Sequence, residues 1–140
     1  MAQASLNTLQ PLPALPAVAD DDGLVSADKI VFAVARIVEL ARPVRVIAFG
    51  SRARGDHRPT SDLDLAVVVD RYDPKVDQRP VWRADLDVWM DIDLLVYDVK
   101  REKLLADSPV SLQSEVRREG VILYERSRGI IDRSAAARLV

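Results

Sequence analysis

The chain has 140 residues, a length that suits one domain with a single hydrophobic core. Hydrophobic residues make up 49% and charged residues 30%, a balance that excludes a disordered or fibrous protein, and the formal net charge of -2 disfavours a protein that coats nucleic acid. Because the chain has no cysteine and one histidine, disulfides and thiolate or histidine-rich metal sites are excluded, so any metal must bind to oxygen ligands.

The first 23 residues contain three prolines and a run of three aspartates, with no apolar periodicity, so we expect a flexible leader at 1–23. No apolar run approaches the roughly 18 residues of a membrane span, and the start lacks the pattern of a signal peptide. We therefore expect a cytoplasmic protein without a membrane partner.

The segment from Ser26 to Arg42 predicts a helix. Apolar residues recur at helical spacing, Ser26 is a suitable N-cap, and Pro43 ends the helix. The short β-branched run 44–49 then predicts a strand that is buried on both faces, and 62–69 predicts a second strand.

A polar connection over 70–79 leads to Trp82, Leu86 and Trp89, whose spacing predicts a short helix with its aromatic side chains in the core. The later pattern predicts a strand at 90–98, helices at 99–106 and 111–119 with Ser111 as a cap and Gly120 as a stop, and a strand at 121–125. Strands that alternate with helices indicate an α/β (α+β) fold, a small mixed β-sheet flanked by helices.

The stretch "FGSRARG" places Gly50 and Ser51 directly after the first predicted strand. A glycine there lets the backbone approach a ligand, and the N–H groups and serine hydroxyl that follow suit a phosphate, although a simple turn has the same pattern. The sequence has neither a P-loop nor a Rossmann motif. Arg52 and Arg54 are candidate phosphate contacts, or simply solvated arginines.

Asp62 and Asp64 lie two residues apart on the second predicted strand, so they share one face with Cα atoms about 6.6 Å apart. Two such carboxylates repel each other, and a divalent cation removes that cost. The pair either binds magnesium, including the two ions about 4 Å apart of phosphoryl-transfer sites, or is solvated at a strand edge. A further D-x-D in "MDIDLLVYD" offers a third carboxylate, and Asp93, deeper in its strand, is preferred to Asp91.

The run from Gly50 to Gly55, the D-x-D at 62–64 and the later aspartate resemble the DNA-polymerase-β-like nucleotidyltransferase superfamily. More narrowly, "GSRARG…SDLDLAVVV" and "REGVILYER" are similar to the minimal nucleotidyltransferases. The resemblance covers roughly 26–126, so we expect a nucleotidyltransferase domain at 24–126 and a tail at 127–140 that either frays or forms a helix that binds a partner.

The resemblance implies a Mg²⁺-dependent transfer of AMP from ATP to a hydroxyl acceptor. Asp62, Asp64 and Asp93 would be the catalytic, metal-binding residues for two Mg²⁺ ions, and Asp93 would also help to deprotonate the acceptor. Gly50 and Ser51 would bind the β- and γ-phosphates of the nucleoside triphosphate, with Arg52 and Arg54 as further nucleotide contacts.

Minimal nucleotidyltransferases often act beside a HEPN protein as the antitoxin of a toxin–antitoxin pair, and can attach AMP to a tyrosine of that partner. The resemblance thus implies protein AMPylation (adenylyl transfer) with a HEPN-type partner and no direct nucleic-acid binding. The alternatives are a non-catalytic antitoxin that acts by occlusion and a small-molecule nucleotidyltransferase. The sequence leaves a homo-oligomer open.

Overall fold

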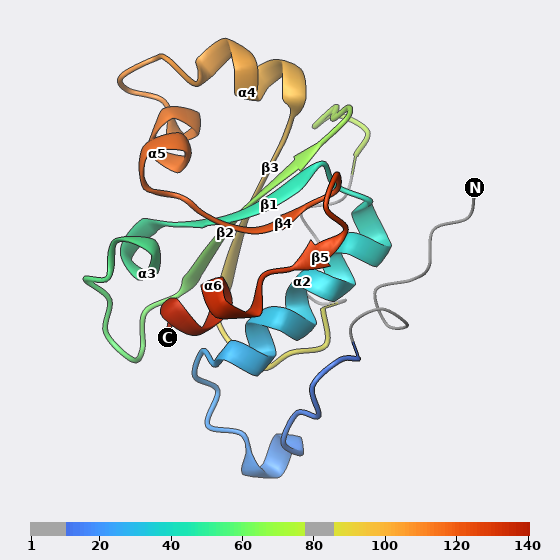
Figure 1. Ribbon diagram of the computed structural model, residues 1–140, viewed down its shortest axis with the longest axis vertical. Helices are drawn as coiled ribbons and strands as arrows, with labels where there is room; N and C mark the ends of the chain where they lie inside the picture. The colour runs from blue at the N-terminus through green and yellow to red at the C-terminus, as the bar shows by residue number, and fades with distance from the viewer. Residues whose placement is uncertain (1–10, 78–85) are drawn as a thin grey trace.

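The computed structural model describes residues 11–77 and 86–140, which form a mixed sheet with helices on both faces (Figure 1). The strand order is β3-β2-β1-β4-β5, and all neighbouring pairs are antiparallel except β2 and β3. The strands are β1 Arg45–Phe49, β2 Leu63–Val69, β3 Ile92–Asp98, β4 Val121–Glu125 and β5 Ile130–Ile131. The helices are η1 Val18–Asp20 (3-10), α2 Ala27–Ala41, α3 Gly50–Arg54, α4 Val99–Leu105, α5 Leu112–Glu119 and α6 Arg133–Arg138.

Helix α2 confirms the first predicted element. The Ser26 hydroxyl accepts a hydrogen bond from the Lys29 N–H at 3.2 Å, which satisfies one of the free donors of the first turn. Ile30, Val34 and Ile37 are fully buried on the face that packs against the sheet. The helix ends at Ala41, just before Pro43, as predicted.

The sheet separates a large core from a small one. The alternation along β2 sends Leu65 and Val67 into the large core with α2 and α6, whereas Ala66 and Val68 belong to the small core on the face that carries α4 and α5. Asp64 has the same parity as Ala66, so its side chain lies on the α4–α5 face of the sheet.

The predicted short helix around Leu86 is only partly described. Trp82 lies outside the described residues, and Leu86 is buried as expected. The described residues after it are not helical, and Trp89 is 52% exposed, so the prediction that Trp89 belongs to the core is wrong. Its indole instead lies beside Gly23, close to the start of α2.

Both ends of the described chain contact the domain. Asp21 accepts a hydrogen bond at 2.6 Å from the Nζ of Lys29, and this ammonium group also donates to the carbonyl of Trp89 at 2.9 Å. At the other end, β5 extends the sheet and α6 packs on α2 and β4 through the buried Ala135 and Ala136. Within the residues that the structure describes, no helix is long and apolar enough to cross a membrane.

Candidate active site

The turn from β1 into α3 requires a glycine at position 50. Gly50 adopts φ +75°, a left-handed conformation that costs other residues about 1–2 kcal/mol. A Cβ at this position would overlap the Oδ2 atom of Asp64 and lie 3.2 Å from its Cγ. The close approach that the sequence predicts for Gly50 is therefore an approach to a carboxylate of the neighbouring strand.

The strand register brings the predicted carboxylates together. Asp64 pairs with Phe49 on β1 and with Asp93 on β3, so Asp64 and Asp93 are direct neighbours across the parallel β2–β3 pair. Asp62 immediately precedes β2 and is exposed, as is Asp93, whereas Asp64 is half-buried. The three side chains thus gather at one end of the two strands, next to the start of α3.

The surroundings of Asp64 raise its pKa above the ordinary value. Burial is the largest cause, followed by repulsion from Asp93, Asp62 and Glu115, and only Arg54 opposes the shift. The sheet therefore holds a carboxylate in surroundings that disfavour its own charge. A bound cation would remove this cost, because it adds the positive charge that the cluster lacks.

The donor set fits a hard cation such as Mg²⁺, which prefers carboxylate oxygens and water. In residues 11–77 and 86–140, however, no group of three or more histidine or acidic side chains converges closely enough to hold a metal ion as it lies. Asp62, Asp64 and Asp93 would have to turn toward a common centre to bind one. The residues are suitable in chemistry and in strand position, but the site is not preformed.

The register favours Asp93 over Asp91 as the third carboxylate. Asp93 lies opposite Asp64 and contributes to the rise in its pKa, whereas Asp91 does not. Asp91 precedes β3, and its backbone carbonyl accepts a hydrogen bond from the Leu63 N–H at 2.9 Å. Asp91 therefore helps to fix the register through its main chain.

Arg52 does not lie where a phosphate could reach it, which corrects the expectation that it binds nucleotide. Its side chain is 2% exposed and donates to the carbonyls of Ser61 (Nε 3.1 Å, Nη2 3.0 Å) and Leu139 (2.9 Å). It also donates to the carbonyls of Arg58 and Pro59 at 3.3 and 3.1 Å. Arg52 thus fixes the loop that leads to Asp62 and joins it to the end of α6.

Arg54 has the opposite surroundings and stays at the surface. Its guanidinium pairs with Asp56 at 3.2 Å, with Glu119 at 3.2 Å and with Glu115 at 3.5 Å. Hydrogen bonds to Asp56 and Glu119 raise the pKa of Arg54. The positive charge of Arg54 also lowers the pKa of Asp64, so Arg54 acts electrostatically on the carboxylate cluster.

Sequence reasoning missed Glu115, which α5 brings close enough to Asp64 to raise its pKa. Nothing in the local pattern of α5 distinguishes Glu115 from a solvated helix residue, because its proximity to Asp64 depends on the packing of α5 against α3 and β1.

Ser51, the other predicted phosphate-binding residue of the turn, lies in the first turn of α3. Its backbone carbonyl accepts hydrogen bonds from the Gly55 and Asp56 N–H groups at 2.9 and 3.1 Å.

The mixed sheet with flanking helices is that of a polymerase-β-like nucleotidyltransferase fold. The family model described as "Polymerase beta, Nucleotidyltransferase" matches residues 35–129, more than half of the chain, and this protein belongs to that family. The match includes Gly50, Asp62, Asp64 and Asp93.

Among solved structures, the chain is similar to one described as a "putative nucleotidyltransferase" from Sulfolobus solfataricus. The identity is 20%, the match covers 75% of this chain and 85% of the other, and the TM-score is 0.49. No curated protein matches the chain significantly.

Proposed function

We propose that this protein transfers AMP from ATP to a hydroxyl group, with two Mg²⁺ ions bound at Asp62, Asp64 and Asp93. The observation that carries the proposal is the register of β2 against β3, which sets Asp64 beside Asp93 next to the turn at Gly50. Family membership supports nucleotidyl transfer in general; the donor, the ions and the acceptor are proposals.

In this proposal, each part of the site has a distinct task. The backbone at Gly50 and Ser51 holds the terminal phosphates, and Arg54 lies at the exposed side to meet their charge. Asp93 accepts the proton of the attacking hydroxyl, since it is exposed and lies next to Asp64. The hydroxyl oxygen attacks the α-phosphorus of ATP, the bond from that phosphorus to the β-phosphate oxygen breaks, and pyrophosphate leaves. Mg²⁺ held by Asp62, Asp64 and Asp93 would supply positive charge against the charge that develops on these phosphates.

For the acceptor, we propose a tyrosine of a HEPN-type protein partner, so that the protein acts as the antitoxin of a toxin–antitoxin pair. Two observations support a protein acceptor. Asp62 and Asp93 are exposed, so a side chain on another protein's surface can approach them, and the motif around Gly50 and Asp62 resembles that of minimal nucleotidyltransferases.

One observation favours a second function, a binding module that covers the active site of its partner without transfer. In the described part of the chain, no three acidic or histidine side chains already form a metal site. A protein that acts by occlusion has no need to close such a site.

Label transfer separates the two functions. The purified chain is incubated with Mg²⁺, α-labelled ATP and lysate of its source cells, and labelled protein is sought by gel and mass spectrometry. The test variants are Asp64→Asn and Asp93→Asn. The matched control is Asp91→Asn, because it makes the same chemical change two residues away and keeps the backbone carbonyl that bonds Leu63.

A labelled band that Asp64→Asn and Asp93→Asn abolish and Asp91→Asn retains would support transfer and identify the acceptor by mass. If no protein is labelled while a partner co-purifies with all forms of the chain, transfer is refuted and occlusion takes its place. If Asp91→Asn abolishes the label and Asp93→Asn does not, the assignment of the third carboxylate is wrong.

A further inference from the structure

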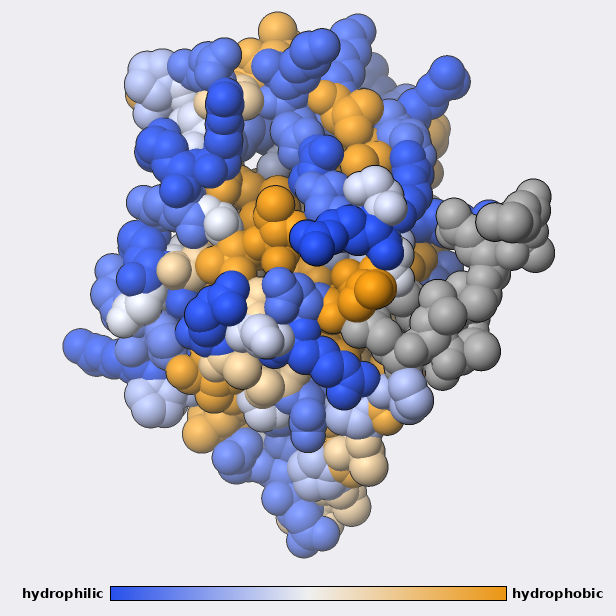
Figure 2. Space-filling view, in the orientation of Figure 1, coloured by the Kyte–Doolittle hydropathy of each residue, from blue (hydrophilic) through white to orange (hydrophobic). Residues whose placement is uncertain are grey.

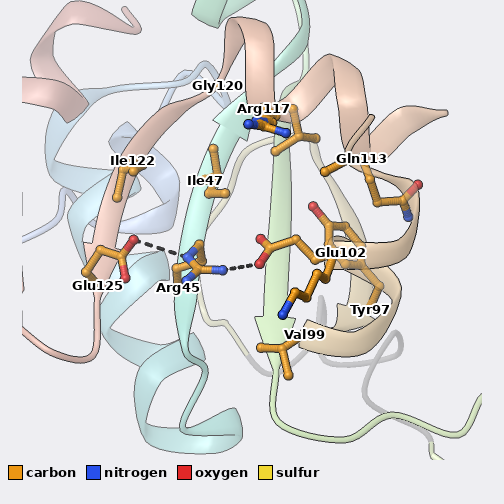
Figure 3. A pocket seen from close by; sticks show the side chains of 13 residues that line it. Arg45, Ile47, Tyr97, Val99, Glu102, Gln113, Arg117, Gly120, Ile122 and Glu125 are labelled. Atoms are coloured by element: carbon orange, nitrogen blue, oxygen red, sulfur yellow. Dashed lines mark hydrogen bonds and ion pairs between the residues drawn. The ribbon is translucent and has the colours of Figure 1, made fainter. Parts of the chain in front are cut away.

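A cleft of about 560 Å³ lies on the α4–α5 face of the sheet, where β1, β3 and β4 form the floor and α4 and α5 the walls (Figure 3). Its size is that of pockets that hold small molecules. None of the residues assigned above to metal or nucleotide lines it. Tyr97 lines it four residues beyond Asp93 along β3, so the cleft lies toward the other end of the strands.

Three of the five charged residues that line the cleft pair with one another, and a fourth, Arg117, pairs with Asp107 beyond the lining. Arg45 donates to Glu125 at 3.1 Å and to Glu102, and all three side chains are about a quarter exposed. The dashed lines in Figure 3 mark these two ion pairs, which join β1 to both β4 and α4. Since this guanidinium already has two carboxylate partners, it offers no free positive charge to an anionic ligand.

One polar atom in the cleft does lack a partner. The Tyr97 hydroxyl is buried and has no hydrogen-bond partner within residues 11–77 and 86–140, and the side chain is 2% exposed. In Figure 3 it points into the space between Ile47, Glu102 and Arg117. Burial, and secondarily Glu102, raise the pKa of Tyr97 to about 12, so the hydroxyl keeps its proton at neutral pH and can donate it.

The rest of the lining is mixed: Gln113, Lys103 and Arg117 are polar or charged, and the other side chains are apolar. Ile47, Val116 and Ile122 line the cleft from β1, α5 and β4. Ile122 is exposed although it is a large hydrophobic residue. In the view of Figure 2, some hydrophobic surface lies at the centre of the molecule. A flat apolar ligand would cover these side chains and remove their surface from water.

We propose that this cleft binds an uncharged aromatic or heteroaromatic small molecule that accepts a hydrogen bond from the Tyr97 hydroxyl. The aromatic body packs on Ile47, Val116 and Ile122, and its carbonyl or ring nitrogen gives the buried hydroxyl the partner that the described protein does not supply. An anionic ligand would find no free cation at Arg45, which already pairs with Glu102 and Glu125.

The proposal does not depend on nucleotidyl transfer. Helix α5 stands between the two sites, with Glu115 toward Asp64 and Val116 toward the cleft. Binding in the cleft can therefore be measured by itself, without nucleotide or metal, and its failure leaves the proposed reaction unaffected.

The test uses benzamide, which carries a neutral carbonyl acceptor, and toluene, which has a similar ring without one. Each is titrated into the full ¹⁵N-labelled chain, and amide resonances are followed by NMR. Benzamide should shift resonances of residues that line the cleft, and Tyr97→Phe should weaken its binding about fivefold to tenfold, the loss of one hydrogen bond. Toluene binding should not change in Tyr97→Phe.

Two further variants keep the test decisive. Tyr124→Phe removes a hydroxyl from β4 on the opposite face of the sheet and should leave both probes unaffected. Ala106→Leu adds bulk to the wall of the cleft and should weaken both. The proposal is overturned if neither probe shifts the cleft resonances, if benzamide binds equally to wild type and Tyr97→Phe, or if benzoate or benzamidine binds more tightly than benzamide.

Discussion

Replacing Gly50 with alanine tests whether this glycine shapes the carboxylate site. The left-handed backbone costs an alanine about 1–2 kcal/mol, and the overlap of the new Cβ with Asp64 adds the cost of a forced repacking, about 1–3 kcal/mol. We therefore expect Gly50→Ala to lower the free energy of unfolding by about 2–5 kcal/mol, measured by urea denaturation.

Gly55→Ala is the matched control for this substitution. Gly55 has φ +84° and no atom within 4 Å of its ideal Cβ, so it bears the backbone strain without the overlap. The difference between the two variants isolates the contact with Asp64. It should shrink in an Asp64→Ala background, where the remaining Asp64 Cβ lies at an ordinary 3.5 Å.

The same change should affect the reaction. A shift of about 1 Å in a group that positions reactants can cost about a hundredfold in rate, so Gly50→Ala should lose labelling activity by about that factor while Gly55→Ala keeps most of it. Equal stability losses in the two variants, together with no coupling to Asp64→Ala, would refute the inference that Gly50 is there to admit the carboxylate.

Three further predictions concern the charged residues. Arg52→Met should lower the free energy of unfolding by about 2–4 kcal/mol because it leaves buried carbonyls without donors, whereas the exposed Arg54→Met should change stability little; similar losses in urea denaturation would contradict this. Asp64→Asn should be more stable than the wild type at pH 7. The pKa of Asp64 is raised in the folded state, so the wild type loses folding stability as the pH rises through that pKa and the carboxyl ionises, whereas the asparagine variant does not. The advantage should vanish below about pH 4, where the carboxyl is protonated in both states, and an advantage that persists there would point to another cause. Mg²⁺ should raise the melting temperature of the wild type more than that of Asp64→Asn, and equal shifts in thermal denaturation would argue against a cation at this carboxylate.

Local patterns were enough to predict most of the helices and strands and two of the candidate site's carboxylates. The β-branched runs and the Ser26 and Ser111 caps mark their elements because strand and helix formation there depend on neighbours in the sequence. The D-x-D at Asp62 and Asp64 could likewise be recognised, since a strand fixes the relative direction of residues two apart.

The remaining features depend on packing between distant segments. No local pattern states that β3 runs parallel to β2, and it is this pairing that puts Asp93 opposite Asp64. Arg52 and Arg54 look alike in sequence, yet one is buried under the loop before β2 and the other lies among carboxylates of α5. Trp89 fits a helical spacing, but the described residues around it form no helix.

The hydrogen bonds of Arg52 also bear on how the domain opens. One guanidinium holds the carbonyls of Arg58, Pro59 and Ser61 and that of Leu139, so the loop before Asp62 and the end of α6 cannot separate without breaking a shared, buried set of bonds. These two segments, almost eighty residues apart in sequence, should therefore unfold as one cooperative unit. Their amide hydrogens would then exchange with solvent at matched rates, and a disturbance at the last helix would reach Asp62, the first carboxylate of the candidate site.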